Sequence, residues 1–230
     1  MKTFKHTVAL TLAGLLAVPA AAFADNAASA YTEDGTAIIG YAAAVAGETN
    51  SLGFTKVLST TLKNSGSPKD LFIGLTFETG LMTETEVKTN TKNGKAEESS
   101  ATASAEIEMY VLVDGQEAKP GTVTFDKREQ AMWATLGQGL VCSDANGDDI
   151  ITFDECSLTD QEVGLLLETK AAHGFNFLSY NIGSGSHTIE AFARLKAQGE
   201  VADASSNAKA SAYLGKGTLS VFEVHDSVTH

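Results

Sequence analysis

The chain has 230 residues, of which 43% are hydrophobic, and a formal net charge of −13 at pH 7. This composition supplies enough apolar side chains for a buried core, so an entirely disordered protein is excluded. An acidic chain without basic clusters repels phosphate groups, which excludes nucleic acids and anionic lipid surfaces as partners and favours a divalent cation or a cationic partner.

The first 24 residues have the three parts of a secretory signal peptide. They are a positive start with Lys2 and Lys5, an apolar run from Val8 to Val18, and the cleavage signal Ala22-Phe23-Ala24. The alternative, a membrane anchor, needs about 20 apolar residues, more than this run holds. We therefore expect a secreted, periplasmic or cell-surface protein with one domain over residues 25–230, no membrane span and, after loss of two lysines and no acid, a charge of −15.

Alternation of apolar and polar residues predicts an all-β domain. The pattern is clearest over residues 101–113, where every second side chain from Ala101 to Val113 is apolar. We expect a two-sheet antiparallel sandwich of jelly-roll or immunoglobulin-like type with about nine strands, because a single sheet cannot cover both of its faces. The other predicted strands are Thr36–Ala46, Phe54–Leu62, Leu71–Leu81 with a continuation through residues 83–91, Gly121–Lys127, Phe175–Ile182, His187–Ala197, Ala208–Tyr213 and Thr218–Val224.

An Asn-Gly turn signal at residues 93 and 94 predicts a hairpin between the strands on either side of it. A two-residue loop would place the apolar face of one strand against the polar face of the other, because the paired residue numbers would then sum to an odd number. We therefore expect a three-residue loop, Lys92 to Gly94, that pairs Leu81 with Ala105 and Phe77 with Met109.

Two short helices are predicted to interrupt the strands. Residues 159–171 begin with Thr159-Asp160-Gln161-Glu162, which reads as a capping box, and apolar residues then recur at helical spacing. Val163, Leu165 and Leu167 also alternate, so a strand is the alternative. The second helix is expected around residues 127–136, which carry Trp133.

The segment CSDANGDDIITFDEC, residues 142–156, holds the only two cysteines of the chain around five acidic residues. Alternate oxygen-bearing residues on a tight turn suit calcium, which binds six to eight oxygen atoms. On a twelve-residue calcium loop the ligands would be Asp144, Asn146, Asp148, the backbone carbonyl of Ile150, Thr152 and Glu155. The segment resembles an EF-hand loop over these twelve positions.

The segment departs from the EF-hand pattern at Asp149, where that family has glycine with a positive φ. The loop is also solitary, whereas EF-hands normally pair. Single acidic loops beside cysteines are also similar to those of secreted calcium modules such as thrombospondin type 3 repeats. The alternative is an acidic surface loop with an Asn146-Gly147 turn and no ion.

A disulfide between Cys142 and Cys156 is expected, because the chain is predicted to be exported and has no third cysteine. Closing a loop of this size contributes about 3 kcal/mol through chain entropy. It would also hold the carboxylates together against their repulsion, so the predicted site is a calcium cage closed by a disulfide.

No catalytic motif is present. His173, His187 and His225 are scattered, and neither a metalloprotease motif nor a nucleophile elbow occurs. We expect His187 to cap a strand. The residues Gly215-Lys216-Gly217-Thr218 lack the earlier glycine of a phosphate loop and are interpreted as a turn. Paired carboxylates of a hydrolase stay open, because their geometry is not visible in a sequence.

Stripes of alanine on two strands permit close approach of the sheets or of a foreign strand at an edge. They are Ala101, Ala103 and Ala105, and Ala208, Ala210 and Ala212.

The alternation as a whole, with GSHTIEAFARL and GKGTLSVFEV near the end, is similar to uncharacterised secreted bacterial β-sandwich proteins. We therefore expect a non-catalytic structural or adhesive protein of the cell surface or extracellular matrix, stabilised by calcium and self-associating through edge strands. The alternatives are a secreted hydrolase and a carbohydrate-binding module that contacts a surface glycan through Trp133, Tyr180 or Phe192.

Overall fold

The computed structural model describes residues 26–33, 40–64, 66, 68–93, 95–144, 147 and 149–224. Within these ranges the chain forms fourteen β-strands, one short 3-10 turn, η1 (Phe153–Glu155), and no α-helix. The prediction of an all-β fold is confirmed, whereas the expected number of about nine strands is too low. None of the described segments is a helix long and apolar enough to cross a bilayer. The predicted signal peptide and its cleavage site lie outside the described residues.

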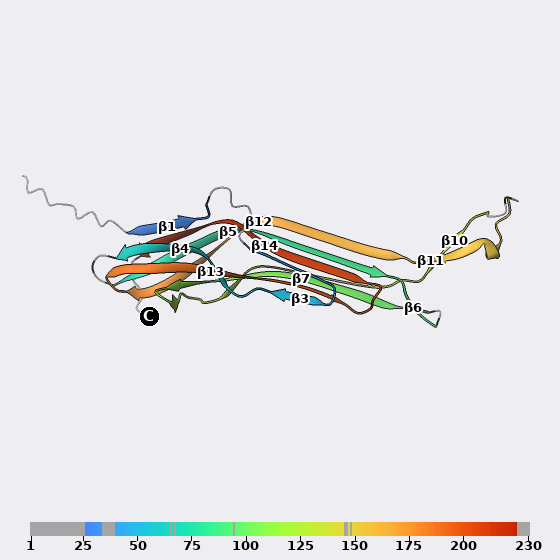
Figure 1. Ribbon diagram of the computed structural model, residues 1–230, viewed down its shortest axis with the longest axis horizontal. Coiled ribbons are helices and arrows are strands. Elements are labelled where there is room, and N and C mark those ends of the chain that lie inside the picture. Colours follow the sequence, from blue (N-terminus) through green and yellow to red (C-terminus); the bar gives the residue numbers. More distant parts are fainter. Residues whose placement is uncertain are drawn as a thin grey trace, which may run out of the picture.

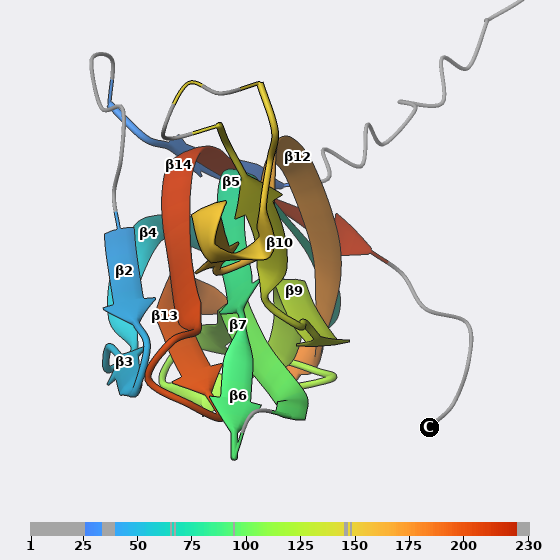
Figure 2. The same cartoon turned by 90° about the vertical axis from the view of Figure 1, so that its right-hand side faces the viewer.

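Two antiparallel sheets pack face to face as an elongated β-sandwich (Figures 1 and 2). The first sheet has the order β1-β14-β5-β12, and β2 also pairs with β14. Its strands are β1 (Ala27–Tyr31), β2 (Gly40–Val45), β5 (Lys69–Lys88), β12 (Glu162–Ile182) and β14 (Asn207–Val224).

The second sheet has β13 and β7 at its centre, with β4 beside β13 and β9 beside β7. The short strands β6 and β8 also pair with β7. The bounds are β4 (Thr55–Asn64), β6 (Asn90–Lys92), β7 (Lys95–Val113), β8 (Gln116–Glu117), β9 (Val123–Thr135) and β13 (Gly185–Val201), while β3 (Glu48–Ser51) lies beside β13.

The core lies between the sheets and follows the predicted alternation. Every second residue of β7 from Ala101 to Val113 is buried, and Leu71, Ile73, Leu75 and Phe77 of β5 face them from the first sheet. The alanine stripes of β7 and β14 belong to this core and are buried within the chain. Gly199 of β13 shows how closely the backbones approach, because a Cβ atom there would lie 2.7 Å from the carbonyl oxygen of Val45. The alanines therefore serve close packing of the sheets.

The predicted pairing of β5 with β7 is wrong. The chain forms a small hairpin in which Lys92 pairs with Lys95 and Asn90 with Glu97, so the loop has two residues, as the Asn-Gly signal alone indicates. Asn93 has a φ of 53°, which suits this turn. Beyond the hairpin, β5 joins β14 and β12 in the first sheet while β7 joins β13 and β9 in the second. The faces of β5 and β7 therefore oppose each other across the core, and the objection to a two-residue loop does not apply.

Both predicted helices are wrong. Residues 162–182 form one continuous strand, β12, paired with β5, and residues 123–135 form β9. The capping motif at Thr159 to Glu162 instead spans the end of β11 (Cys156–Thr159) and the start of β12. On β9 the inward side chains include the polar Asp126, Arg128 and Gln130, so the strand lacks the apolar alternation that would reveal it.

The last two predicted strands are a single strand, β14, with a register shift between Leu214 and Gly217. The Gly215-Lys216-Gly217 segment is therefore an irregularity within a strand, where a turn was predicted. Glycine is needed there because a Cβ atom on residue 217 would lie 2.1 Å from the ring of Phe77. Close approach of a buried ring explains the glycine.

Polar side chains of β9 close the side of the sandwich between β9 and β12. Gln130 donates to Thr85 Oγ1 (2.5 Å) and to the carbonyl of Leu165 (2.8 Å), and it accepts from Thr83 (2.9 Å). Arg128 contacts Thr169, and Asp126 accepts a hydrogen bond of 2.6 Å from Thr79. This polar seam joins the two sheets where the core ends.

Candidate functional site

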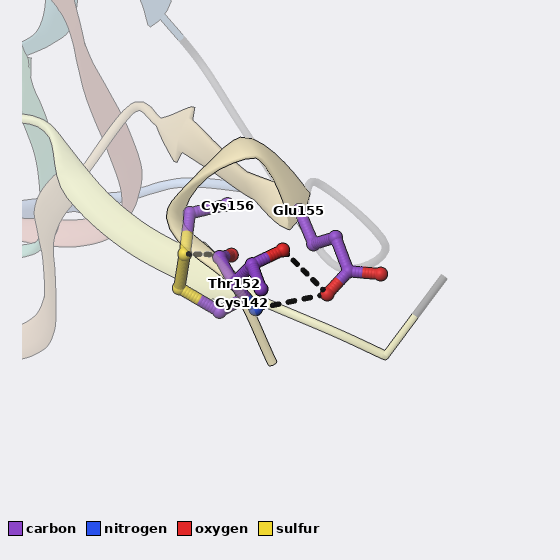
Figure 3. Close-up of a disulfide and its surroundings, with 4 residues drawn as sticks. All are labelled: Cys142, Thr152, Glu155 and Cys156. Atoms are coloured by element: carbon purple, nitrogen blue, oxygen red, sulfur yellow. Dashed lines mark hydrogen bonds between the residues drawn. A yellow bond between two sulfur atoms is a disulfide. The ribbon is translucent and has the colours of Figure 1, made fainter. Parts of the chain in front are cut away.

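The acidic segment forms the tip of a hairpin that projects from one end of the sandwich (Figure 1). Its two strands are β10 (Gly139–Cys142) and β11 (Cys156–Thr159), which pair antiparallel with Cys142 opposite Cys156. These two cysteines form a disulfide with a Cα–Cα distance of 3.9 Å (Figure 3). The predicted disulfide is confirmed, and it fixes both ends of the acidic loop.

The entry of the loop is organised around Asp144. Its carboxylate accepts two backbone hydrogen bonds, from the N–H of Gly147 (2.6 Å) and from the N–H of Asp149 (2.8 Å). Gly147 and Asp149 both have positive φ angles, of 76° and 62°. Asp149 therefore adopts the left-handed conformation that the calcium-loop template requires at this position, although it is not glycine.

The exit of the loop is organised around Thr152, which precedes the turn η1, and Glu155, the last residue of that turn (Figure 3). The Glu155 carboxylate accepts hydrogen bonds from the N–H of Thr152 (2.9 Å) and from its hydroxyl (3.1 Å). In return, the N–H of Glu155 donates to the carbonyl of Thr152 (3.0 Å). These bonds hold the last predicted ligand next to the fifth.

Four of the six predicted ligands, Asp144, Ile150, Thr152 and Glu155, are described, whereas Asn146 and Asp148 lie outside the described residues. Within the part of the chain that the structure describes, no group of three or more His, Cys, Asp or Glu side chains is placed to hold a metal. That all six ligands converge on one ion therefore remains a prediction. The donor set consists of oxygen atoms alone, which fits a calcium ion and not a softer metal.

Apolar side chains on the same hairpin are exposed. Phe153 has 82% of its surface accessible, and Ile150 and Ile151 are also exposed. Exposed large apolar residues continue through the first half of β12, at Val163, Leu165, Leu166 and Leu167. Single exposed apolar residues are ordinary, but a row along one segment indicates a contact surface.

The two described histidines have structural partners. His187 Nδ1 lies 2.6 Å from the Asp114 carboxylate, and its Nε2 lies 2.9 Å from the carbonyl of Gly183. Because both partners accept hydrogen bonds, they favour the doubly protonated ring, and the bond to Asp114 raises the pKa of His187. His173 lies 3.4 Å from Asp126, which also contacts Thr79. Each of the two histidines therefore has an aspartate as its neighbour. Neither arrangement places a serine or cysteine nucleophile against the histidine as a base. His225 lies outside the described residues.

The three aromatic residues considered for glycan binding do not form one platform. Phe192 of β13 stacks on Tyr110 of β7 with ring centroids 5.0 Å apart. Trp133 of β9 pairs with Ser100 of β7, so ten residues of β7, about 33 Å, separate it from Tyr110. Tyr180 lies near the end of β12 in the other sheet. Only Trp133 is strongly exposed among them, at 68%.

Sequence reasoning missed the polar seam of β9, because residues 127–136 were assigned to a helix. The available signal was the spacing of Asp126, Arg128 and Gln130, which puts three polar side chains on one face of a strand. Sequence reasoning also missed the hydrogen bond between His187 and Asp114, since the two residues are 73 positions apart in the sequence.

No family model matches this chain, and no curated protein matches it. Among solved structures, the chain matches the crystal structure of the infectious bursal disease virus VP2 subviral particle at 10% sequence identity with a TM-score of 0.13. The match covers 88% of this chain and 42% of the viral chain, so this chain spans less than half of that protein. A likeness at this level carries no argument about fold or function.

Proposed function

We propose that the mature chain is a non-catalytic, secreted structural or adhesive protein of a bacterial cell surface or extracellular matrix, which self-associates through an edge strand and is stabilised by calcium. The sequence of residues 1–24 supports export, and the disulfide is consistent with an oxidising compartment. The sandwich is of the jelly-roll type in this proposal. The supporting feature is the division of the seven longest strands between two facing sheets, with β5, β12 and β14 in one sheet and β4, β7, β9 and β13 in the other.

The observation that carries the proposal is the outer edge of β12. This strand of 21 residues pairs with β5 on one side, and no described strand pairs along its other side. Contacts there are a bridge from Lys119 to Leu178 and side chains of the polar seam, which reach the carbonyl of Leu165 and the side chains of Thr169 and His173. Proteins normally shorten, cover or charge such an edge, because its backbone groups can bind another strand. The exposed Val163, Leu165, Leu166 and Leu167 add apolar surface to it. An added strand would bury both the backbone groups and these side chains.

Calcium would act at the hairpin that leads into β12. Asp144 and Glu155 with Thr152 would hold the ion together with Asn146, Asp148 and the carbonyl of Ile150. The ion would neutralise the loop's carboxylates and so stabilise the hairpin. In the extracellular affinity range of about 10⁻⁴ to 10⁻³ M, a tenfold excess over the dissociation constant adds about 1.4 kcal/mol. The site is then a stabiliser and not a sensor.

The test of self-association is electron microscopy and light scattering of the purified mature protein, with calcium and with a chelator. We expect ordered assemblies, and we expect the double variant Leu165→Lys/Leu167→Lys to stay monomeric because charge blocks the edge. The control, Tyr41→Lys/Phe222→Lys, introduces two lysines at exposed positions away from the first half of β12 and should still assemble. Monomers of the wild-type protein under every condition would refute the proposed role.

A further inference from the structure

A polar trough lies on the outer face of the second sheet. It is a cavity of about 280 Å³ over β9, β7 and β13. Short hydroxyl side chains on the central strand, Thr102 and Ser104, form its floor. Longer side chains on the two flanking strands form its walls, and these are Lys127 and Glu129 of β9 and Gln198 and Glu200 of β13, while Glu106 follows Ser104 along β7.

The strand register explains the shape of the trough. Ser104 of β7 is paired on one side with Glu129 of β9 and on the other with Gln198 of β13. Paired residues in a sheet point to the same face, so Ser104 lies between two long side chains. One pair further along, Thr102 lies between Ala131 and Glu200, and the small Ala131 opens the wall on the β9 side.

The only tryptophan of the chain stands at the end of this trough. Trp133 follows Ala131 on the same face of β9 and is paired with Ser100 of β7. Gln130 and Met132, which alternate with these residues, point inward. The side chain of Trp133 is 68% exposed, so its ring is available to a ligand lying along the trough. The stretch of β7 from Ser100, beside Trp133, to Ser104 in the trough spans about 13 Å, which is long enough for a short oligosaccharide.

The side chains that line the trough carry a net negative charge. Three of them are glutamates and one, Lys127, is a lysine, which forms an ion pair with Glu129 at 3.4 Å. Lys196, outside the lining, lies 3.6 Å from Glu106, and Gln198 donates a hydrogen bond of 2.5 Å to Glu200. The trough therefore offers donors and acceptors to a ligand, and its negative charge repels acidic sugars. Hydroxyl groups, each of which both donates and accepts, match such a surface, and an apolar sugar face matches an exposed indole ring.

We propose that this trough binds a neutral oligosaccharide, with one sugar ring stacked on Trp133 and the next rings hydrogen-bonded by Ser104, Glu129 and Gln198. This activity is separate from self-association and from the calcium loop, because the trough uses no residue of either. The chain would thereby attach to neutral polysaccharide through one face and assemble through an edge.

The experiment uses the fluorescence of Trp133, which reports on this site alone because the chain has one tryptophan. Cellohexaose, xylohexaose, maltohexaose, mannohexaose and N-acetylchitohexaose are titrated into the mature protein up to about 10 mM, a range that captures even weak binding. We expect at least one of these neutral oligosaccharides to shift and saturate the emission, with matching heats in calorimetry. Failure of all five, or equal binding of acidic oligogalacturonate, would overturn the proposal.

Two variants locate the binding. Calorimetry on Trp133→Ala should show affinity about tenfold weaker through loss of stacking. Ser104→Arg, which fills the floor and leaves the tryptophan in place, should abolish the response. The control Phe222→Ala removes an exposed aromatic residue from the outer part of the other sheet and should bind as the wild type does. Unchanged binding in both Trp133→Ala and Ser104→Arg would refute this site even if a glycan binds.

Discussion

The body of the sandwich and the projecting hairpin are stabilised in different ways. In the body, apolar side chains of β5, β7, β13 and β14 are buried between two sheets, so the hydrophobic effect holds the fold together. In the hairpin of β10 and β11, the large apolar residues are exposed, and a disulfide and hydrogen bonds to carboxylates hold the loop. Among the described residues the hairpin contributes nothing to the buried core, so we expect the body to fold without it and the hairpin to be accessible to an ion or a partner.

The comparison is tested most strongly by making the same substitution in each region. Phe77→Ala empties a fully buried site in the body and should lower the free energy of unfolding by about 3 to 5 kcal/mol. Phe153→Ala in the hairpin removes an exposed ring and should change it by less than about 0.5 kcal/mol. Urea denaturation followed by circular dichroism measures both. Similar losses for the two variants would show that the hairpin ring packs on the body.

Removing the disulfide should affect the hairpin alone. In Cys142→Ser/Cys156→Ser the loop loses a constraint of about 3 kcal/mol, so residues 143–155 should exchange amide hydrogens faster and be cut sooner by protease. The melting temperature of the body should stay near that of the wild type, because the hairpin adds little to the core. A large drop in that temperature would contradict the separation of the two regions.

Calcium should stabilise the hairpin through its oxygen ligands. Asp144→Asn/Glu155→Gln should remove the calcium-dependent gain in local stability of the hairpin, about 1.4 kcal/mol at tenfold excess, measured by amide hydrogen exchange of residues 142–156 with calcium and with chelator. Asp154→Asn is the matched control, because it removes a charge from the same loop at a position that is not a predicted ligand. If Asp154→Asn lost the calcium-dependent gain to the same extent, the gain would come from general neutralisation of charge and not from ion binding by the predicted ligands.

The smallest expected effect concerns the other end of the sandwich, where His187 bridges Asp114 and Gly183. The pKa of His187 is raised in the folded state, so its contribution is complete below the unfolded value of about 6.5 and is lost as the pH rises through the higher folded value. Burial opposes the shift of Asp114, but hydrogen bonds from His187 and the Thr188 N–H lower its pKa. That contribution is lost as the pH falls through the lowered pKa of Asp114.

We therefore expect the wild-type chain to lose more stability than His187→Gln between about pH 6 and pH 8, as measured by urea denaturation at each pH. His173→Gln is the control, since His173 is more exposed and lies further from its carboxylate. If the free energy of unfolding changed with pH in the same way for the wild type and His187→Gln, the proposed contribution of the His187–Asp114 contact would be contradicted.

The sequence predicts those parts of the molecule whose pattern is local. The alternation of apolar and polar residues predicted β7 and most of β5, because each of these strands has one buried face. The disulfide could be predicted because the chain has only two cysteines. Strand β9 was hidden by polar side chains that face inward to satisfy the threonines of β5, a pairing between sheets that no local pattern reveals. The first half of β12 was assigned to a helix because the capping motif at Thr159 outweighed the alternation of Val163, Leu165 and Leu167, and both faces of this half are exposed, so no buried face marks it as a strand. The trough could not be predicted from the sequence, because the residues that line it come from three separate strands.

The most direct test of the account is hydrogen exchange of the mature protein, measured by mass spectrometry with calcium and with chelator. We predict that calcium slows exchange in residues 142–156 and leaves β5, β7 and β14 unchanged, because the ion binds the hairpin and the core forms without it. Unchanged exchange in the hairpin, or calcium-dependent protection spread through those core strands, would contradict the account.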